Sequence, residues 1–210
     1  FPAFGRAAGP NEAGTVIAVA GPVTVTRLSA TAQQLRFRDS LFWRDVVDTH
    51  KDGIARVLLG GKATVTVREL SRLELRQEEV PVGIRYSVDL LSGKVRATLA
   101  RMMMLPTEQV QVRTRNAMST VRGTDFIVET MERPSQPGAF GLLGARELIE
   151  AIADQRTIRQ ETLVATLSGA VDVVNPLSGT GRAVRTRPYE GALVSGTRDP
   201  IRFQFTQGEL

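Results

Sequence analysis

Apolar and polar residues alternate along several short stretches of the chain, so that each stretch carries its apolar side chains on one face. A period of two residues is typical of half-buried strands and not of helices. Two β-branched runs, at 126–128 and 170–174, add further strand material. The alternating stretches lie at 23–26, 63–67, 110–113 and 201–205. Turn residues such as Gly-Pro, Asp-Gly and Gly-Gly separate them, which predicts an all-β fold of many short strands.

One local pattern recurs at three distant places. The segments 21–25, 93–97 and 169–173 share the form Gly-x-Val-x-Val/Ala. Each predicts a glycine at a bend or bulge, followed by a strand whose valines point inwards. The segments are too far apart for the period of a solenoid repeat. They favour similar corners within one large β structure, either a sandwich or a solenoid-like stack.

The pattern changes between residues 138 and 160. Apolar residues from Leu142 to Ile152 recur at helical spacing, with Glu147 and Glu150 between them. We predict one helix near 145–156, inserted into the β chain. It either caps an open end of the core or faces a partner.

The length of 210 residues suits one large β domain or two small ones. We expect an N-terminal tail at 1–13 and a β domain at 14–200. The helical insertion occupies 130–160 of that domain, and a C-terminal strand or tail follows at 201–210.

The charge of the chain is nearly balanced. Lys and Arg total 27 against 22 Asp and Glu, giving +5, and the excess is spread along the sequence. Nucleic-acid binders concentrate positive charge to neutralise neighbouring phosphates. No run reaches the 18 or so apolar residues that a membrane helix needs. We therefore expect neither a nucleic-acid partner nor a membrane span.

Few residues offer catalytic or metal chemistry. The chain has no cysteine, which excludes thiol catalysis and thiolate metal sites. The single histidine, His50, falls in a polar turn and is expected to be solvated. Residues 77–79, which include the pair Glu78 and Glu79, are predicted to form another solvated turn. We expect no enzyme, no cofactor and no metal.

Two groups of large apolar residues have alternative roles. Trp43 either packs in the core or serves as a surface aromatic for a glycan or a protein partner, with Arg36, Arg38 and Arg44 nearby. Three consecutive methionines, Met102, Met103 and Met104, cannot all face inward on a strand. They favour either a protein contact or packing within a loop.

Residues 114–128 contain Thr-x-Asn-Ala followed by Val-Arg-Gly-Thr-Asp-Phe. This segment resembles the core motif of FecR-type domains, and segments at 14–23, 48–59, 91–95 and 162–171 resemble other parts of that family in the family's order. The ordered set extends over 14–195. The residues that carry the core motif are Thr114, Asn116, Ala117, Val121, Arg122, Gly123, Thr124, Asp125 and Phe126.

The chemistry of this motif favours a structural role. Gly123 suits a tight bend where a Cβ would clash. Thr124 and Asp125 are able to hydrogen-bond the local backbone, and Phe126 is expected to point inward. Arg122 either pairs with Asp125 or another carboxylate, or binds a ligand.

The resemblance implies an all-β domain outside the cytoplasmic membrane that acts by protein contact. The best-known members form the periplasmic part of a transmembrane regulator that relays receptor occupancy to a sigma factor. This sequence shows no membrane helix, no cytoplasmic segment and no further receptor-contacting domain, and it starts at Phe1. We expect a stand-alone exported domain, periplasmic or extracellular, whose leader was cleaved or whose chain was trimmed.

The leading hypothesis is a non-enzymatic assembly module, such as the subunit of a homopolymer or an envelope scaffold. Both chain ends, Phe1–Phe4 and Ile201–Phe205, would then dock onto a neighbouring copy by strand addition. One alternative is a sensor or signalling module that binds a receptor or another envelope protein. The other is a carbohydrate-binding module. The candidate partner contacts are Phe1, Phe4, Met102, Met103, Met104, Phe140, Leu142 and Leu143.

Overall fold

The computed structural model describes residues 11–28, 30–81, 83–99, 107–121, 123–133 and 159–206. All the regular secondary structure in these ranges is β, in 17 strands. The prediction of an all-β fold with many short strands is therefore confirmed. The helix predicted near 145–156 lies outside the described residues.

The strands form two open sheets. In sheet I the spatial order is β4 (Ser40–Phe42), β1 (Glu12–Ala20), β6 (Ile54–Leu59), β7 (Ala63–Val67), the second half of β9 (Gly83–Leu99), β12 (Asp125–Arg133), β13 (Arg159–Ser168), β16 (Glu190–Ser195) and β17 (Ile201–Gln204). In sheet II it is β3 (Gln33–Gln34), β2 (Val23–Thr26), β5 (Val46–Thr49), β8 (Arg72–Val80), the first half of β9, β10 (Glu108–Arg113), β11 (Met118–Val121), β14 (Val171–Val174) and β15 (Ala183–Thr186). Neighbouring strands are antiparallel except β9 and β10.

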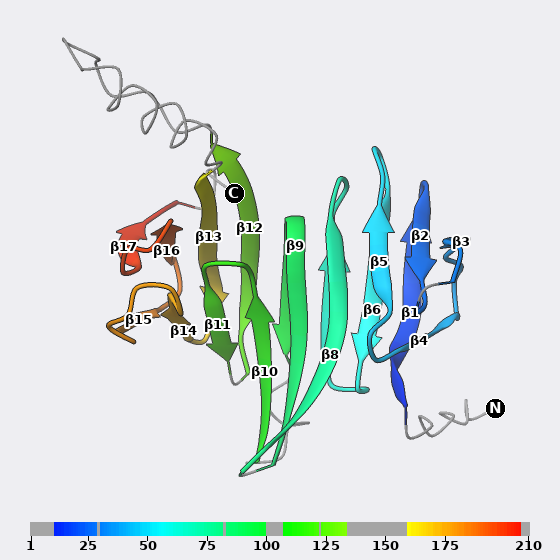
Figure 1. Ribbon diagram of the computed structural model, residues 1–210, viewed down its shortest axis with the longest axis horizontal. Helices are drawn as coiled ribbons and strands as arrows, with labels where there is room; N and C mark the ends of the chain where they lie inside the picture. The colour runs from blue at the N-terminus through cyan, green and yellow to red at the C-terminus, as the bar shows by residue number, and fades with distance from the viewer. Residues whose placement is uncertain are drawn as a thin grey trace, which may run out of the picture.

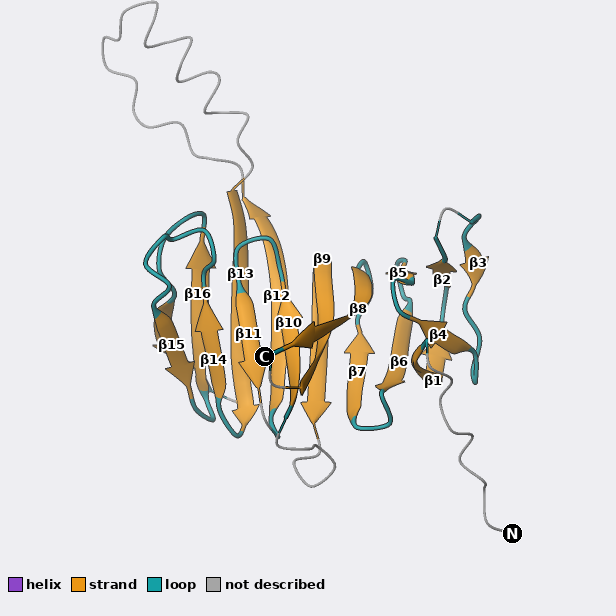
Figure 2. Ribbon diagram, turned by 60° about the horizontal axis from the view of Figure 1, so that its bottom comes forward, coloured by secondary structure: helices purple, strands orange, loops and turns teal. Residues whose placement is uncertain are grey.

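Strand β9 connects the two sheets. Its residues 83–92 pair with β8 in sheet II, and its residues 93–98 pair with β12 in sheet I. Figure 1 shows β9 near the middle of the molecule, with β10 and β11 in front of β12 and β13. Figure 2 shows the same rows of strands after rotation, with β15 and β16 at one end and β3 at the other. The long strand therefore joins the two layers at their centre.

The core lies between the two sheets and is built from alternating positions of the strands. On β7, for example, Ala63, Val65 and Val67 are buried while Thr64 and Thr66 face outward. The core consists mostly of Val, Ala and Leu, and Phe126 is its largest fully buried side chain. Burial of one face of each sheet explains the alternation seen in the sequence.

The three recurring glycines lie where the chain passes from one sheet to the other. Gly21 separates β1 from β2, Gly169 separates β13 from β14, and Gly93 marks the crossing point within β9. All three have positive φ, and that of Gly93 is +88°. A Cβ on Gly93 would come within 2.5 Å of the Ser71 Cα. The prediction of similar corners is confirmed.

One turn prediction is wrong. Residues 77–79 belong to β8, which continues to Val80 and pairs with β9 along its whole length. Glu74, Arg76 and Glu78 face outward, as polar residues do in a half-buried strand. Gln77 occupies an inward position, but it lies beyond the end of the core, so no apolar residue marks the alternation there. Charged residues on the outer face of a strand were therefore mistaken for a turn.

Several candidate contacts lie outside the described residues. They are Phe1, Phe4, Met102, Met103, Met104, Phe140, Leu142 and Leu143. Within the ranges that the structure describes, no helix is long and apolar enough to cross a membrane.

Candidate functional site

The turn between β10 and β11 ties the two sheets together. Asn116 is buried, and its amide donates hydrogen bonds to the carbonyl oxygens of Gln160 (2.8 Å) and Val194 (3.1 Å). The hydroxyl of Thr162 donates to the Asn116 Oδ1 at 2.6 Å, and Thr114 lies 2.8 Å from the same hydroxyl. Thr114 and Asn116 therefore have a structural role.

The rest of the core motif forms a corner and the strand that follows it. Gly123 has φ +65°, and Thr124 donates its hydroxyl to the Ala170 carbonyl at 3.0 Å. The side chains of Ala117, Val121 and Phe126 are buried. Seven of the nine motif residues therefore serve packing or backbone contacts. Arg122 lies outside the described residues.

Asp125 binds an arginine that the sequence did not indicate. Its carboxylate accepts two hydrogen bonds from Arg96, at 2.9 and 2.5 Å, and one from Thr98 at 3.2 Å. The hydrogen bond to Asp125 raises the pKa of Arg96, so the guanidinium stays charged. Arg96 and Asp125 are far apart in sequence but adjacent on β9 and β12.

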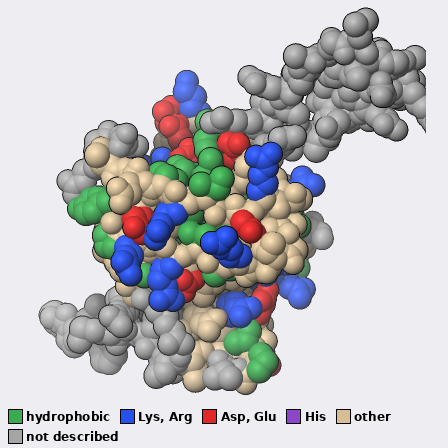
Figure 3. All heavy atoms as spheres, turned by 90° about the vertical axis from the view of Figure 1, so that its left-hand side faces the viewer, with side chains coloured by type: hydrophobic (Ala, Val, Ile, Leu, Met, Phe, Trp, Pro, Cys, Tyr) green, Lys and Arg blue, Asp and Glu red, His purple; other side chains and the backbone are tan. Residues whose placement is uncertain are grey.

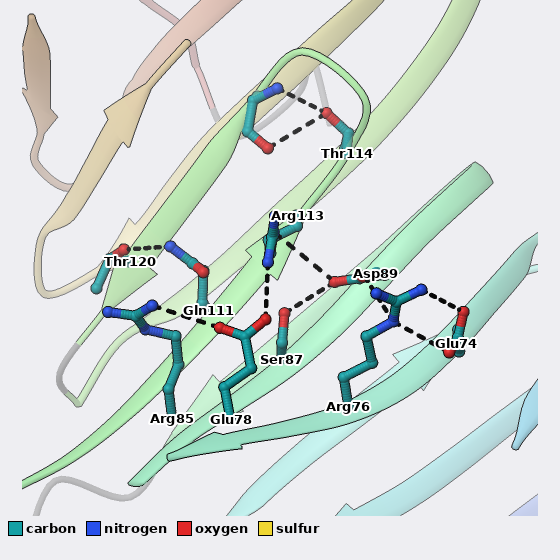
Figure 4. A network of polar contacts seen from close by, with 11 residues as sticks. Glu74, Arg76, Glu78, Arg85, Ser87, Asp89, Gln111, Arg113, Thr114 and Thr120 are labelled. Carbon is teal, nitrogen blue, oxygen red and sulfur yellow. Dashed lines mark hydrogen bonds and ion pairs between the residues drawn. The ribbon is translucent and has the colours of Figure 1, made fainter. Parts of the chain in front are cut away.

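The outer face of sheet II carries a network of ion pairs that neutralise one another (Figure 4). Arg76 contacts Glu74 at 2.9 Å and Asp89 at 3.1 Å, and Arg113 contacts Glu78 at 2.9 Å. The chain of contacts contains three bases and three acids: Glu74, Arg76, Asp89, Arg113, Glu78 and Arg85. An incoming charged partner would have to displace these pairs.

The outer face of sheet I differs because it contains a hollow surrounded by cations. We call it the basic hollow and define it by Arg56, Thr66, Arg68, Lys94 and Arg96. Its volume is about 330 Å³, and its aliphatic rim consists of Ile54, Ile127 and Leu167. No carboxylate lines it.

The register of three strands explains this arrangement. Thr66 on β7 lies opposite Arg56 on β6 and opposite Arg96 on β9. Arg68 follows Thr66 by two residues and Lys94 precedes Arg96 by two, so both point to the same face. The small Thr66 thus lies between Arg56 on β6 and Arg96 on β9, with Arg68 next along its own chain.

The cations of the basic hollow are only half neutralised. Lys94 pairs with Glu129 at 3.1 Å, and Arg96 pairs with Asp125. Arg56 and Arg68 make no side-chain hydrogen bond or ion pair in the part of the chain that the structure describes. Two guanidinium groups are therefore available to an external anion.

Trp43 is a packing residue in the structure. Its ring stacks on Tyr86 with centroids 5.7 Å apart and 18° between the planes, and it packs against the core. Tyr86 in turn hydrogen-bonds the buried Glu108 at 3.4 Å, and Glu108 pairs with Lys62. One face of the Trp43 ring is thus covered.

His50 lies exposed in the turn before β6, where its backbone N–H donates to the Pro22 carbonyl at 3.0 Å. Among the described residues, no three His, Asp or Glu side chains gather as a metal ion would require. The turn therefore serves the backbone of the β5–β6 connection.

The end of the molecule formed by β15, β16 and β17 has a mixed surface. Figure 3 shows basic, acidic and apolar side chains interspersed on it. An aromatic group lies there, with Tyr189 and Phe203 at 6.4 and 6.3 Å from Phe205. Charges of both signs are therefore mixed on the part of this end that the structure describes.

Comparisons with known proteins agree with the fold. Residues 45–139 match the family model described as FecR protein. No curated protein matches the chain. Two crystal structures of a candidate anti-sigma factor from Parabacteroides distasonis ATCC 8503, at 1.65 and 2.50 Å resolution, each have a TM-score of 0.50 and 17% sequence identity. Each similarity covers 76% of this chain and 59% of that chain, and it shows the fold alone.

Sequence reasoning missed the basic hollow. Arg56, Lys94 and Arg96 stand beside buried residues in strands, and Arg68 directly follows the buried Val67 at the end of β7, so their outward direction was predictable. Their grouping depends on β6, β7 and β9 being neighbours, which no local pattern indicates. All four residues fall within the segment that matches the FecR family.

Proposed function

We propose, from the FecR domain that residues 45–139 form, that this chain is a regulatory protein-binding module of an envelope signalling system. It acts by contact with another protein, outside the cytoplasmic membrane. The family match is the observation that carries this proposal. The similarity in fold to a candidate anti-sigma factor supports a regulator of that type.

The signalling reading replaces the assembly reading as the main hypothesis. The tail that was expected to dock onto a neighbouring copy, Ile201–Phe205, contains β17, and β17 pairs with β16 of its own chain. Neither the family nor the similar structures are described as polymers or scaffolds. The alternative stated from the sequence is the better supported one.

Deletion of the gene in its native organism, followed by transcript sequencing, tests the proposal. A regulator of a sigma factor should change a compact set of transcripts whose promoters share one recognition sequence. Expression of the exported chain from a second locus should restore the original levels. Unchanged transcripts together with a weakened envelope would contradict the proposal and favour a scaffold.

A further inference from the structure

We infer that the basic hollow is the docking site for an extended acidic segment of a partner protein, with carboxylates at alternate positions bound by Arg56 and Arg68. This inference rests on the proposed function, because it names the partner class of a protein-binding module. It is carried by the geometry of sheet I.

The spacing of the two free arginines matches an extended chain. Arg56 lies opposite Thr66, and Arg68 is two residues beyond Thr66, so the two arginines are diagonal neighbours. Diagonal positions on adjacent strands are about 7–8 Å apart. Residues i and i+2 of an extended peptide are roughly 6.6 Å apart and point in the same direction. Two carboxylates at i and i+2 therefore reach one arginine each.

The chemistry of the hollow suits carboxylates. A guanidinium presents a planar fork of donors that matches a carboxylate with two parallel hydrogen bonds. Arg56 and Arg68 keep this fork free of any partner in the described part of the chain. Lys94 and Arg96 are already paired with carboxylates, so Arg56 and Arg68 carry the uncompensated positive charge of the hollow.

The aliphatic rim of the basic hollow indicates which residues of the partner segment flank its acidic pair. Ile54 lies beside Arg68, and Ile127 lies beside Arg96 in the same row of sheet I. Both are only half buried, so apolar residues flanking the carboxylates would cover them. A segment that carries apolar residues on either side of an acidic pair satisfies both parts of the surface.

The small number of free cations argues against other anionic partners. Polybasic segments that bind anionic membranes carry clusters of about 4–8 Lys or Arg, and nucleic-acid binders neutralise several neighbouring phosphates. Of the four cations that line the hollow, only Arg56 and Arg68 lack a carboxylate partner among the described residues. Recognition of a short acidic pair fits this number.

Nuclear magnetic resonance with synthetic peptides tests the inference. The probe is a terminally blocked heptapeptide, Leu-Ser-Glu-Ser-Glu-Ser-Leu, titrated into the isotope-labelled chain. A second peptide with the same composition has its glutamates adjacent, Leu-Ser-Glu-Glu-Ser-Ser-Leu. We expect shifts of the Arg56, Thr66, Arg68 and Arg96 signals, and weaker binding of the second peptide.

Variants separate this site from general charge attraction. The double variant Arg56→Gln, Arg68→Gln should bind the first peptide about tenfold or more weakly, because two charge-assisted contacts are lost. The matched control Arg115→Gln, Arg187→Gln removes two other exposed arginines and the same charge. It should bind within about twofold of the original chain. Circular dichroism establishes that both variants are folded.

Three results would overturn the inference: equal binding of the two peptides, equal loss in both double variants, or stronger binding of inorganic phosphate or of phosphatidylglycerol vesicles than of the first peptide. The outcome is independent of the transcript experiment. Peptide binding without any transcript change would reject the regulatory function and keep the site. A transcript change without peptide binding would reject the site and keep the regulatory function.

Discussion

Buried amides and hydroxyls hold the two sheets together. Asn116 reaches from the β10–β11 turn to backbone carbonyls of sheet I, and Asn175 after β14 bonds the carbonyls of Gly196 and Arg198 at 3.0 and 2.7 Å. Thr49 at the end of β5 in sheet II donates its hydroxyl to the carbonyl of Arg68, directly after β7 of sheet I, at 2.5 Å. Each side chain supplies a hydrogen-bond donor to backbone carbonyls of another segment of the chain.

Replacement of Asn116 by alanine should lower the free energy of unfolding by about 1–3 kcal/mol, because two buried carbonyls lose their donor. Urea denaturation followed by circular dichroism measures the change. The neighbouring Arg115 is exposed, and Arg115→Ala should alter stability by less than about 0.5 kcal/mol. Equal effects of the two substitutions would show that Asn116 does not link the sheets.

Ionisation of the Tyr86 phenol is expected to make the stability of the fold depend on pH. Burial and the nearby Glu108 raise the pKa of its phenol above the ordinary 10.0, because both disfavour the phenolate. A raised folded-state pKa contributes stability below the unfolded-state value, and that stability is lost as the pH rises through the folded-state value. Ultraviolet titration of the original chain against Tyr86→Phe isolates this group. Glu108→Gln should lower the pKa of Tyr86, and an unchanged pKa would contradict the assignment.

The sequence indicated some of the side chains that make these contacts, but it did not indicate their partners. Thr114, Asn116 and Thr124 were identified as motif residues, and backbone contacts were predicted for Thr124. The partners of Asn116 lie 44 and 78 residues away, in β13 and β16. The motif predicted local backbone contacts for Asp125, or a pair with Arg122; among the described residues its carboxylate pairs with Arg96 on the neighbouring strand. Partners at such distances follow from strand order, which a local pattern does not contain.

The elements follow from the alternation of residue types, and their arrangement follows from the corners between them. The stretches at 23–26, 63–67 and 110–113 all lie within strands β2, β7 and β10. The glycine corners were predictable as bends, since each precedes inward-facing valines. Their role in moving the chain from one sheet to the other was not, because a bend alone does not say which strand the chain will pair with next.

The corner at Gly93 is therefore a sensitive position. Its φ of +88° is strained for any other residue, and an added Cβ would clash with the backbone of Ser71. Gly93→Ala should lower the free energy of unfolding by roughly 2–4 kcal/mol. Gly61 has φ +71° and open space around it, so Gly61→Ala tests the backbone strain alone and should lower it by about 1 kcal/mol. Urea midpoints that rank the two variants in the opposite order would contradict the account.

At the scale of the whole molecule, the two outer faces differ in how their charges are arranged. Arg76, Arg85 and Arg113 on sheet II are matched by carboxylates, whereas Arg56 and Arg68 on sheet I have no carboxylate partner among the described residues. A net charge of +5 spread along the sequence gave no hint of this contrast. The pairing of strands converts an even distribution in sequence into one neutral face and one basic hollow.

The continuous core predicts that the chain unfolds as one unit. Trp43, the single tryptophan, packs near one end of the sheets, while circular dichroism reports on all strands. Urea transitions followed by tryptophan fluorescence and by circular dichroism should coincide. Separate midpoints would indicate two units that unfold independently.

We propose that the basic hollow binds the partner protein through which this chain regulates transcription. The measurement that tests it most directly is the transcript response in the native organism after Arg56→Glu, Arg68→Glu is introduced. We expect the same transcript changes as in the gene deletion, with the variant protein folded and present at its normal level. The control Arg115→Glu, Arg187→Glu should leave transcripts unchanged. Normal transcripts in the first variant, or the same change in both, would contradict the claim.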